Sequence, residues 1–244
     1  MLLRCIRAEN RKLRRSPIWL LFLTVPAISA VYGTFNYTMN LGILTHGWYD
    51  LWTQYTLFYA IFFFAPLIGV YASYLWRLEH RGHNWNLIMT APVRPFCLYF
   101  AKFCAVTKLT VLTQGWLLVL FTVGGKFGAG LPGFPPPEIV LWLLRGVIGG
   151  LAIIALQLLL SMVIRNFALP VLIALGGSVA GLLAVGKDLG LYWPYSLMIM
   201  GMNSNRTEDV MAGGIWGFFL SSAVFLAVFL LIANEFLTKR DVNA

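Results

Sequence analysis

Residues that could carry out chemistry are few in this sequence, and none has the spacing of a known catalytic motif. No GxxxxGK[ST] phosphate loop is present, because Gly124-Gly125-Lys126 lacks the other glycine at the required distance. No HExxH zinc motif is present, and Gly177-Ser178 lacks the second glycine of a GxSxG nucleophile elbow. We therefore expect neither enzyme activity nor a cofactor in this chain.

Glu79, His80 and His83 come nearest to a metal-binding group. Two histidines and a carboxylate in a polar segment are more often solvated surface than a metal site, so no metal is expected. The three cysteines are odd in number and show no CxxC spacing, which predicts free thiols.

Ionisable residues within apolar stretches are the next candidates, because charge at membrane depth is costly. Lys102 is expected to extend to the cytoplasmic headgroups, whereas Lys108 lies deeper. Arg145 follows Glu138 by two helical turns on nearly the same face, and it either reaches the outer headgroups or lines an outward cavity. The candidates for a cavity or gate are Lys108, Glu138, Arg145, Trp193 and Pro194.

The segment 77–95 is the most informative polar stretch. It mixes charged residues with apolar ones such as Trp85 and Leu87, a pattern that suits a short surface helix docking a soluble partner. Pro92 would end that helix before the next apolar stretch begins. A solvated loop is the alternative.

The elements that must position these residues are membrane-spanning helices. Hydrophobic residues make up 59% of the 244 residues and charged residues 11%, whereas soluble proteins average roughly 45–50% apolar. The 18 Lys and Arg exceed the 9 Asp and Glu and cluster at the ends of apolar stretches. That placement indicates membrane topology and anionic headgroups rather than nucleic-acid binding.

Six apolar stretches are long enough to span a bilayer, which takes about 20 helical residues. The predicted spans are 17–35, 54–76, 96–123, 139–164, 167–185 and 215–233. Residues 1–16 are basic and amphipathic, which predicts a helix on the membrane surface. The residues expected to act in that helix are Arg4, Arg7, Glu9, Arg11 and Lys12. The whole chain, 1–244, is expected to form a single all-α membrane domain.

Lys and Arg in the short flanking segments fall on one side, so both termini are predicted to be cytoplasmic. The opposite segments are rich in aromatic residues, glycine and proline, as in Tyr192-Trp193-Pro194-Tyr195. Because Trp and Tyr favour the headgroup level, these segments are expected to lie on the membrane surface.

Short motifs along the chain resemble one family of membrane proteins. The basic opening at 7–16 resembles that of ABC-2-type permeases, and the order of Glu, Trp, Pro-Val and Tyr-x-x-Lys resembles the lantibiotic-immunity branch. The residues that carry this order are Glu79, Trp85, Ala91-Pro92-Val93, Tyr99 and Lys102, with Tyr192-Trp193-Pro194-Tyr195 before the last span.

The resemblance implies a bacterial plasma-membrane permease that pairs with a second permease subunit and two copies of an ATP-binding subunit. ATP and Mg²⁺ would then be bound by that partner. A coupling helix between the second and third spans would contact the partner through Glu79, His80, Arg81, Trp85 and Leu87. The complex would expel antimicrobial peptides from the membrane, giving self-immunity or resistance.

Two other functions stay open from the residues alone. An exporter of this kind can carry a lipid, a polysaccharide or a drug instead of a peptide. A stand-alone channel or membrane scaffold is the further alternative, and it would have no ATP-binding partner.

Overall fold

The computed structural model describes residues 1–80 and 94–239, and every regular element within these ranges is a helix. Of the predicted coupling residues, Arg81, Trp85 and Leu87 lie outside the described residues. The elements in chain order are α1 (Leu2–Leu13), α2 (Ile18–Met39), α3 (Trp48–Phe58), the π-helical turn η1 (Tyr59–Phe63), α4 (Phe64–His80), α6 (Pro95–Val123), the π-helical turn η3 (Gly124–Gly128), α7 (Pro137–Val163), α8 (Ala168–Gly186), the 3₁₀ turn η4 (Gly190–Tyr192), α9 (Pro194–Gly201) and α10 (Gly214–Lys239).

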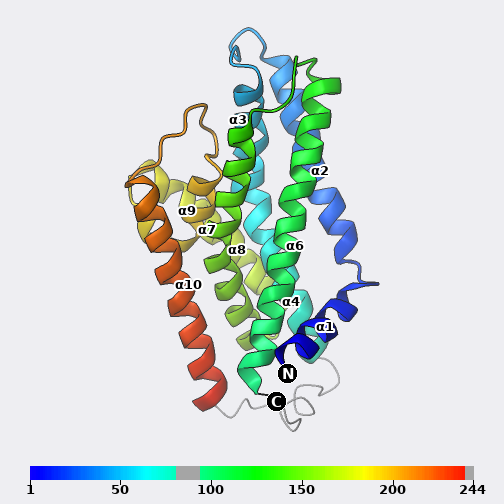
Figure 1. The fold of residues 1–244 in the computed structure, drawn as a ribbon, viewed down its shortest axis with the longest axis vertical. Coiled ribbons are helices and arrows are strands. Elements are labelled where there is room, and N and C mark those ends of the chain that lie inside the picture. The colour runs from blue at the N-terminus through cyan, green and yellow to red at the C-terminus, as the bar shows by residue number, and fades with distance from the viewer. Residues whose placement is uncertain (81–93, 240–244) are drawn as a thin grey trace.

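Six of these helical segments are long and apolar enough to cross a membrane, which confirms the predicted architecture. The second is the continuous run Trp48–His80 through α3, η1 and α4, so it begins earlier than predicted. The spans pack side by side, and α1 crosses them at one end (Figure 1). That end, where α10 also finishes, is called the base of the bundle below; the opposite end is called the top (Figure 1).

The π-helical turn within the second span has a local cause. Pro66 lacks an N–H group, and its ring crowds the carbonyl four residues earlier, at Phe62. The preceding turn widens, so that the Phe64 N–H bonds to the Tyr59 carbonyl. Ser178 of α8 donates to the Ala60 carbonyl at 3.3 Å, which ties α8 to this turn.

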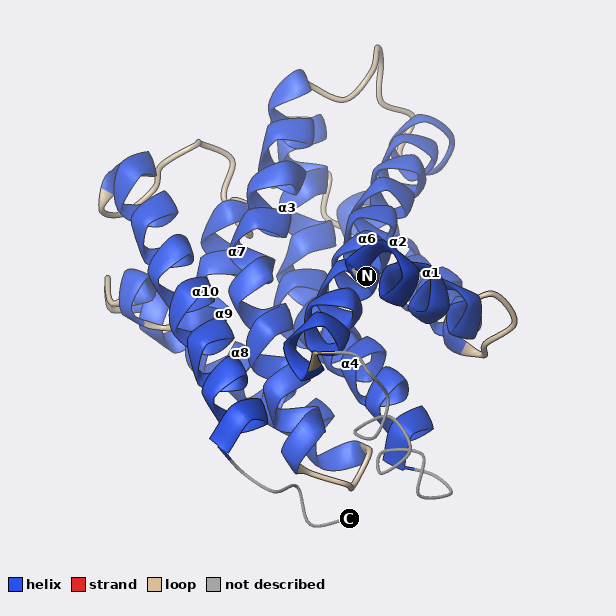
Figure 2. Cartoon of the chain, turned by 60° about the horizontal axis from the view of Figure 1, so that its bottom comes forward, coloured by secondary structure: helices blue, strands red, loops and turns tan. Residues whose placement is uncertain are grey.

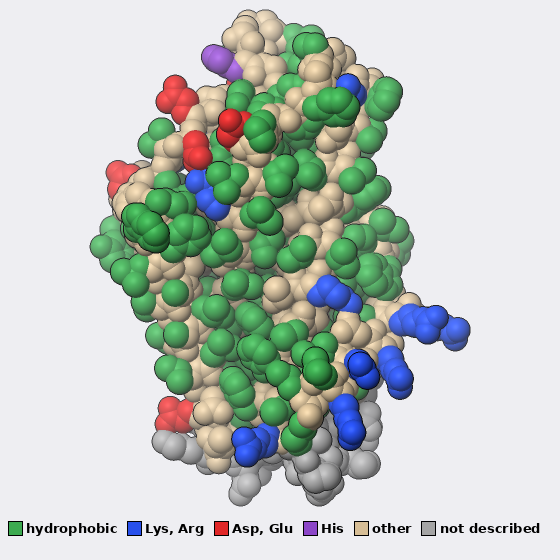
Figure 3. Space-filling view, in the orientation of Figure 1, with side chains coloured by type: hydrophobic (Ala, Val, Ile, Leu, Met, Phe, Trp, Pro, Cys, Tyr) green, Lys and Arg blue, Asp and Glu red, His purple; other side chains and the backbone are tan. Residues whose placement is uncertain are grey.

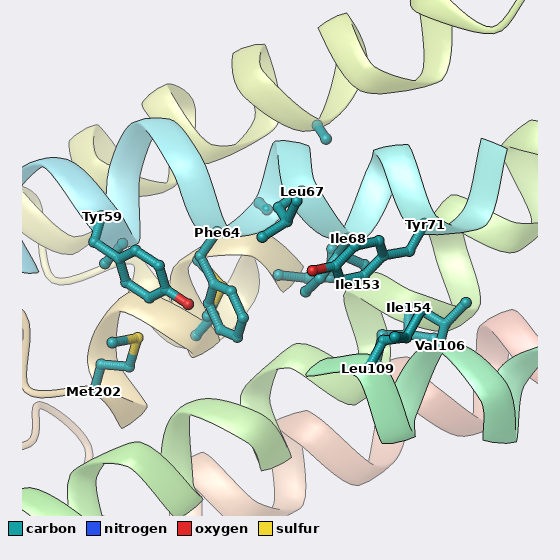
Figure 4. Close-up of a cluster of buried hydrophobic side chains, with 14 of the residues drawn as sticks. Tyr59, Phe64, Leu67, Ile68, Tyr71, Val106, Leu109, Ile153, Ile154 and Met202 are labelled. Atoms are coloured by element: carbon teal, nitrogen blue, oxygen red, sulfur yellow. The ribbon is translucent and has the colours of Figure 1, made fainter. Parts of the chain in front are cut away.

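The core fills with aromatic and branched side chains from the second, third and fourth spans. Tyr59 and Phe64 stack with their ring centroids 5.2 Å apart and face Met202 (Figure 4). Trp52 is fully buried, and its indole N–H donates to the Met202 carbonyl at 3.0 Å. The large aromatic ring of Trp52 is thus buried while its polar N–H group keeps a hydrogen-bond partner.

Helix α9 departs from the prediction that this segment lies on the membrane surface. Pro194 begins the helix, and Pro194–Ile199 and Gly201 are all buried. Only Tyr192 and Trp193, just before it, are exposed. The apolar sequence after Pro194 buries its side chains by folding back between α7 and α8 instead of staying at the headgroups.

Glycine makes this insertion sterically feasible. A Cβ atom on Gly149 of α7 would lie 2.5 Å from the Leu197 carbonyl oxygen, and one on Gly201 would lie 2.6 Å from the Arg145 carbonyl oxygen. On α8, a Cβ on Gly181 would lie 3.0 Å from the Ser196 nitrogen. Small residues allow such backbone approach between helices. Gly150 has only ordinary contact with a side chain.

Replacing Gly149 with alanine should therefore separate α7 from α9. Because a new Cβ would collide with backbone that cannot rotate away, we expect Gly149→Ala to destabilise the protein by about 1–3 kcal/mol. Gly115→Ala on α6 is the matched control, since open space surrounds that position. Thermal unfolding in detergent measures both. Equal melting temperatures for the two variants would contradict the close α7–α9 contact.

Candidate functional site

Four charged side chains from three helices meet at the base of the bundle, and we call them the basal ion-pair cluster: Glu9 and Lys12 of α1, Glu79 of α4 and Lys102 of α6. Lys102 Nζ lies 3.0 Å from Glu9 Oε2 and 2.6 Å from Glu79 Oε1. Lys12 Nζ lies 2.7 Å from Glu9 Oε1 and also pairs with Glu79 Oε1. The cluster contains two positive and two negative charges, so it is neutral overall.

Lys102 does not extend to the headgroups, so that prediction was wrong. The residue is 1% exposed and points into the bundle. An ammonium group has three protons to donate. Here Glu9, Glu79 and the Leu75 carbonyl accept from it, the last at 3.4 Å. The Trp76 ring, 5.1 Å away, adds a cation–π contact. These partners replace water, so snorkelling would gain nothing.

The helical spacing of α1 explains how a carboxylate enters the bundle from a surface helix. Cys5, Glu9 and Leu13 are four residues apart, form one stripe, and are the buried residues of α1. The stripe lies against α6. Glu9 is 2% exposed, and its charge is costly to bury unless it is paired. The cluster therefore holds α1 in one position on the bundle.

Lys12 is the most accessible member of the cluster, with a side chain that is 31% exposed. Its partial burial acts to lower the pKa of its ammonium group, but the nearby Glu9 and Glu79 carboxylates outweigh this effect. The pKa of Lys12 is therefore raised above its ordinary value. Lys12 stays protonated at neutral pH and remains available to both carboxylates.

The predicted coupling residue His80 packs onto the bundle. Its Nε2 atom lies 3.1 Å from the Ser161 carbonyl of α7, and its ring stacks on Trp76 at 6.1 Å. Glu79 and His80 thus point to different partners. Across residues 1–80 and 94–239, no group of three or more His, Cys, Asp or Glu side chains is placed to hold a metal ion.

The arginines predicted to act in the surface helix lie on the outside of the bundle, and so does Lys108. Arg4, Arg7 and Arg11 are exposed. Lys108 of α6 is also exposed and donates to Asn10 Oδ1 of α1. Its ammonium group thus lies beside α1, on the outer surface of the bundle.

The other predicted cavity or gate residues lie toward the top. Arg145 is 6% exposed, and its Nη2 donates to both carboxylate oxygens of Asp209 at 2.8 Å. Glu138 is exposed and accepts from the Tyr49 hydroxyl at 3.5 Å, so it is not the partner of Arg145. Trp193 is 39% exposed and donates to the Gly177 carbonyl at 2.8 Å.

Two features of the top were not predicted from the sequence: the pairing of Asp209 with Arg145, and the buried helix α9. Asp209 stands in a polar loop, and nothing in its neighbours indicates a partner 64 residues away. Pro194 at the start of an apolar stretch was the one available signal for α9, because proline is common at the first position of a helix. We call α9 and the Arg145–Asp209 pair the top site; the pair joins α7 to the loop after α9.

Lys102→Met should be strongly destabilising, because it leaves two buried carboxylates with a single partly exposed cation. Loss of one partner of a buried pair costs about 3–5 kcal/mol. Lys108→Met is the matched control on the same helix, and we expect it to stay within about 0.5 kcal/mol because Lys108 is exposed. Unfolding of both variants in detergent gives the comparison. A Lys102→Met chain as stable as the control would refute the buried pairing.

Comparison with known proteins places the sequence in a family. Residues 5–181 match the sequence model of the ABC-2 family transporter proteins. The match runs from α1 into α8 and includes Glu9, Glu79 and Lys102. No curated protein matches the chain. Since the family match covers well over half of the sequence, the chain belongs to the ABC-2 family of transporter proteins, as a multi-pass membrane permease.

Proposed function

We propose that this chain is the membrane subunit of an exporter that expels lantibiotic-type antimicrobial peptides from the bacterial plasma membrane and so protects the cell. Membrane subunits of the ABC-2 family generally lack ATPase activity, and membership implies association with an ATP-binding subunit. In this proposal two copies of that subunit bind ATP and Mg²⁺, and a second permease subunit, identical or homologous, completes the pathway.

The orientation in this proposal places the base of the bundle in the cytoplasm. Lys and Arg side chains gather toward the base, and most of the Asp and Glu side chains on this face lie toward the top (Figure 3). An excess of Lys and Arg on cytoplasmic segments is the usual rule for membrane proteins. Helix α4 ends and α6 begins at the base (Figure 1), and in this proposal an ATP-binding subunit docks there, at the sequence segment 81–93 between them.

The observation that carries the proposal is the basal ion-pair cluster. Glu79 is the penultimate residue of α4, and Lys102 is the eighth residue of α6, so the cluster joins the two helices that flank the segment 81–93. Glu9 adds α1 to the same unit. Since separating a buried pair is costly, a displacement of α4 or α6 by the ATP-binding subunit would move all three helices together.

The top site supports a second part of the proposal, in which α9 closes the transport pathway at the top of the bundle. Buried α9 fits between α7 and α8 and is held by the Trp52–Met202 hydrogen bond and the Arg145–Asp209 pair. The Asp209 side chain is 37% exposed, so water can compete for this pair more readily than for the basal cluster. In the proposed cycle, α9 yields when cargo leaves.

Coupling is tested by reconstituting the chain with its ATP-binding subunit. We expect Glu79→Ala and Trp85→Ala to reduce ATPase stimulation to near the rate of the ATP-binding subunit alone and to abolish peptide resistance. Glu138→Gln, exposed at the top, is the control and should retain both activities. Co-purification separates lost assembly from lost coupling. If both alanine variants keep stimulation and resistance, the coupling assignment fails.

The cargo is tested separately, in cells and in vesicles. Cells that produce the complex should survive higher concentrations of lantibiotic peptides than cells without it, and lipid flipping by the purified complex should be unchanged by ATP. ATP-dependent flipping without peptide resistance would instead identify a lipid exporter. Ion flux through the purified chain alone would favour a channel.

A further inference from the structure

The exposed side of α1 carries a set of arginines with no ion-pair partner among the described residues. We call it the arginine face: Arg4, Arg7 and Arg11 of α1 and Arg14 directly after the helix, all exposed. At 100° per residue, Arg7 and Arg11 each lie about 200° from Glu9 around the helix. The arginine face is therefore directed away from the basal ion-pair cluster, on the opposite side of the same helix.

The depth of α1 is set by its junction with the first span. Leu13 ends α1, and Ile18 begins α2, so few residues separate them. The Trp19 indole N–H donates to the Leu13 carbonyl at 2.8 Å across this junction. Because tryptophan favours the headgroup level, this contact places the end of α1 at the boundary between hydrocarbon and water.

The lateral position of α1 also favours lipid over a soluble partner. Helix α1 lies at the periphery of the bundle when the base is turned toward the viewer (Figure 2). Several Lys and Arg side chains project sideways there, where lipid must surround the protein (Figure 3). Leu3, close to Arg7 on the helix surface, is 71% exposed, which suits contact with acyl chains more than with water.

We propose that the arginine face binds anionic phospholipid headgroups and that this binding holds α1 in its docked position, so the basal ion-pair cluster responds to membrane charge. Lys108, exposed and bonded to Asn10 on the flank of α1, extends the cationic surface onto α6. Each basic residue near an anionic surface contributes roughly fivefold in binding. The proposal does not depend on the nature of the transported cargo.

Cys5 provides a natural reporter of α1 docking, because it lies on the buried stripe with Glu9 and Leu13. A chain with Cys97→Ser and Cys104→Ser keeps this thiol alone. In lipid nanodiscs, we expect maleimide to label Cys5 at least about fivefold more slowly in phosphatidylcholine mixed with phosphatidylglycerol than in phosphatidylcholine alone. High salt should reduce the difference, because it screens the headgroup charge.

Variants of the arginine face then test whether its positive charge causes the lipid dependence of Cys5 labelling. Replacing Arg4, Arg7 and Arg11 with glutamine should remove the lipid dependence, and replacing all three with lysine should keep it. Lys126→Gln, in η3 at the top, is the control for a lost positive charge. A chain that keeps only Cys97 corrects for any effect of surface charge on thiol reactivity.

Equal labelling of Cys5 in the two lipids would overturn the proposal, as would a glutamine variant that still responds to phosphatidylglycerol. Protection of Cys5 by the ATP-binding subunit in phosphatidylcholine, without an effect of phosphatidylglycerol, would assign the arginine face to that protein instead. Because the assay uses neither ATP hydrolysis nor transport, its failure leaves the proposed export function to its own tests.

Discussion

Burying a carboxylate within an apolar bundle is the constraint on which the base of this protein depends. Glu9 and Glu79 are almost inaccessible to water, and each pairs with Lys102, which lies between them, and with Lys12 at the edge of the cluster. The requirement acts on three helices at once, since no member of the cluster can leave without stranding a charge. Lipid gives the two spans no hydrophobic reason to associate, and the polar contacts of the cluster join them to each other and to the surface helix α1.

The top of the bundle relies on a different principle, the close approach of backbone to backbone. Helix α9 is short and its apolar side chains are buried, and glycines on α7 and α9 allow the two backbones to contact each other directly. Trp52 then completes the packing with an indole hydrogen bond. The two ends thus differ in kind, with buried charge at the base and mainly steric fit at the top.

The sequence was sufficient for features that depend on composition over many residues. Apolar length predicted six spans, and amphipathic spacing predicted the helix at the start of the chain. Contacts between distant residues were not predictable in this way. Lys102 alone is compatible with snorkelling, and only the positions of Glu9 and Glu79 in space show why it stays inside. Likewise, the apolar stretch after Pro194 is too short to be recognised as membrane-embedded by length.

The Arg145–Asp209 pair has a consequence for how the protein is made. Arg145 leaves the ribosome 64 residues before Asp209, which at ordinary rates of synthesis is about 3–13 s. During that interval Arg145 has no Asp209 to pair with. An arginine at the centre of a span costs about 2.5–3.5 kcal/mol, and Arg145, the ninth of the 27 residues of α7, lies nearer the end, where the cost is lower. Glu9 also precedes its partner Lys102, by 93 residues, but it lies on α1, which is not one of the six spans. The loop after α9 therefore neutralises a charge on α7 that was synthesised 64 residues earlier, before α10 is made.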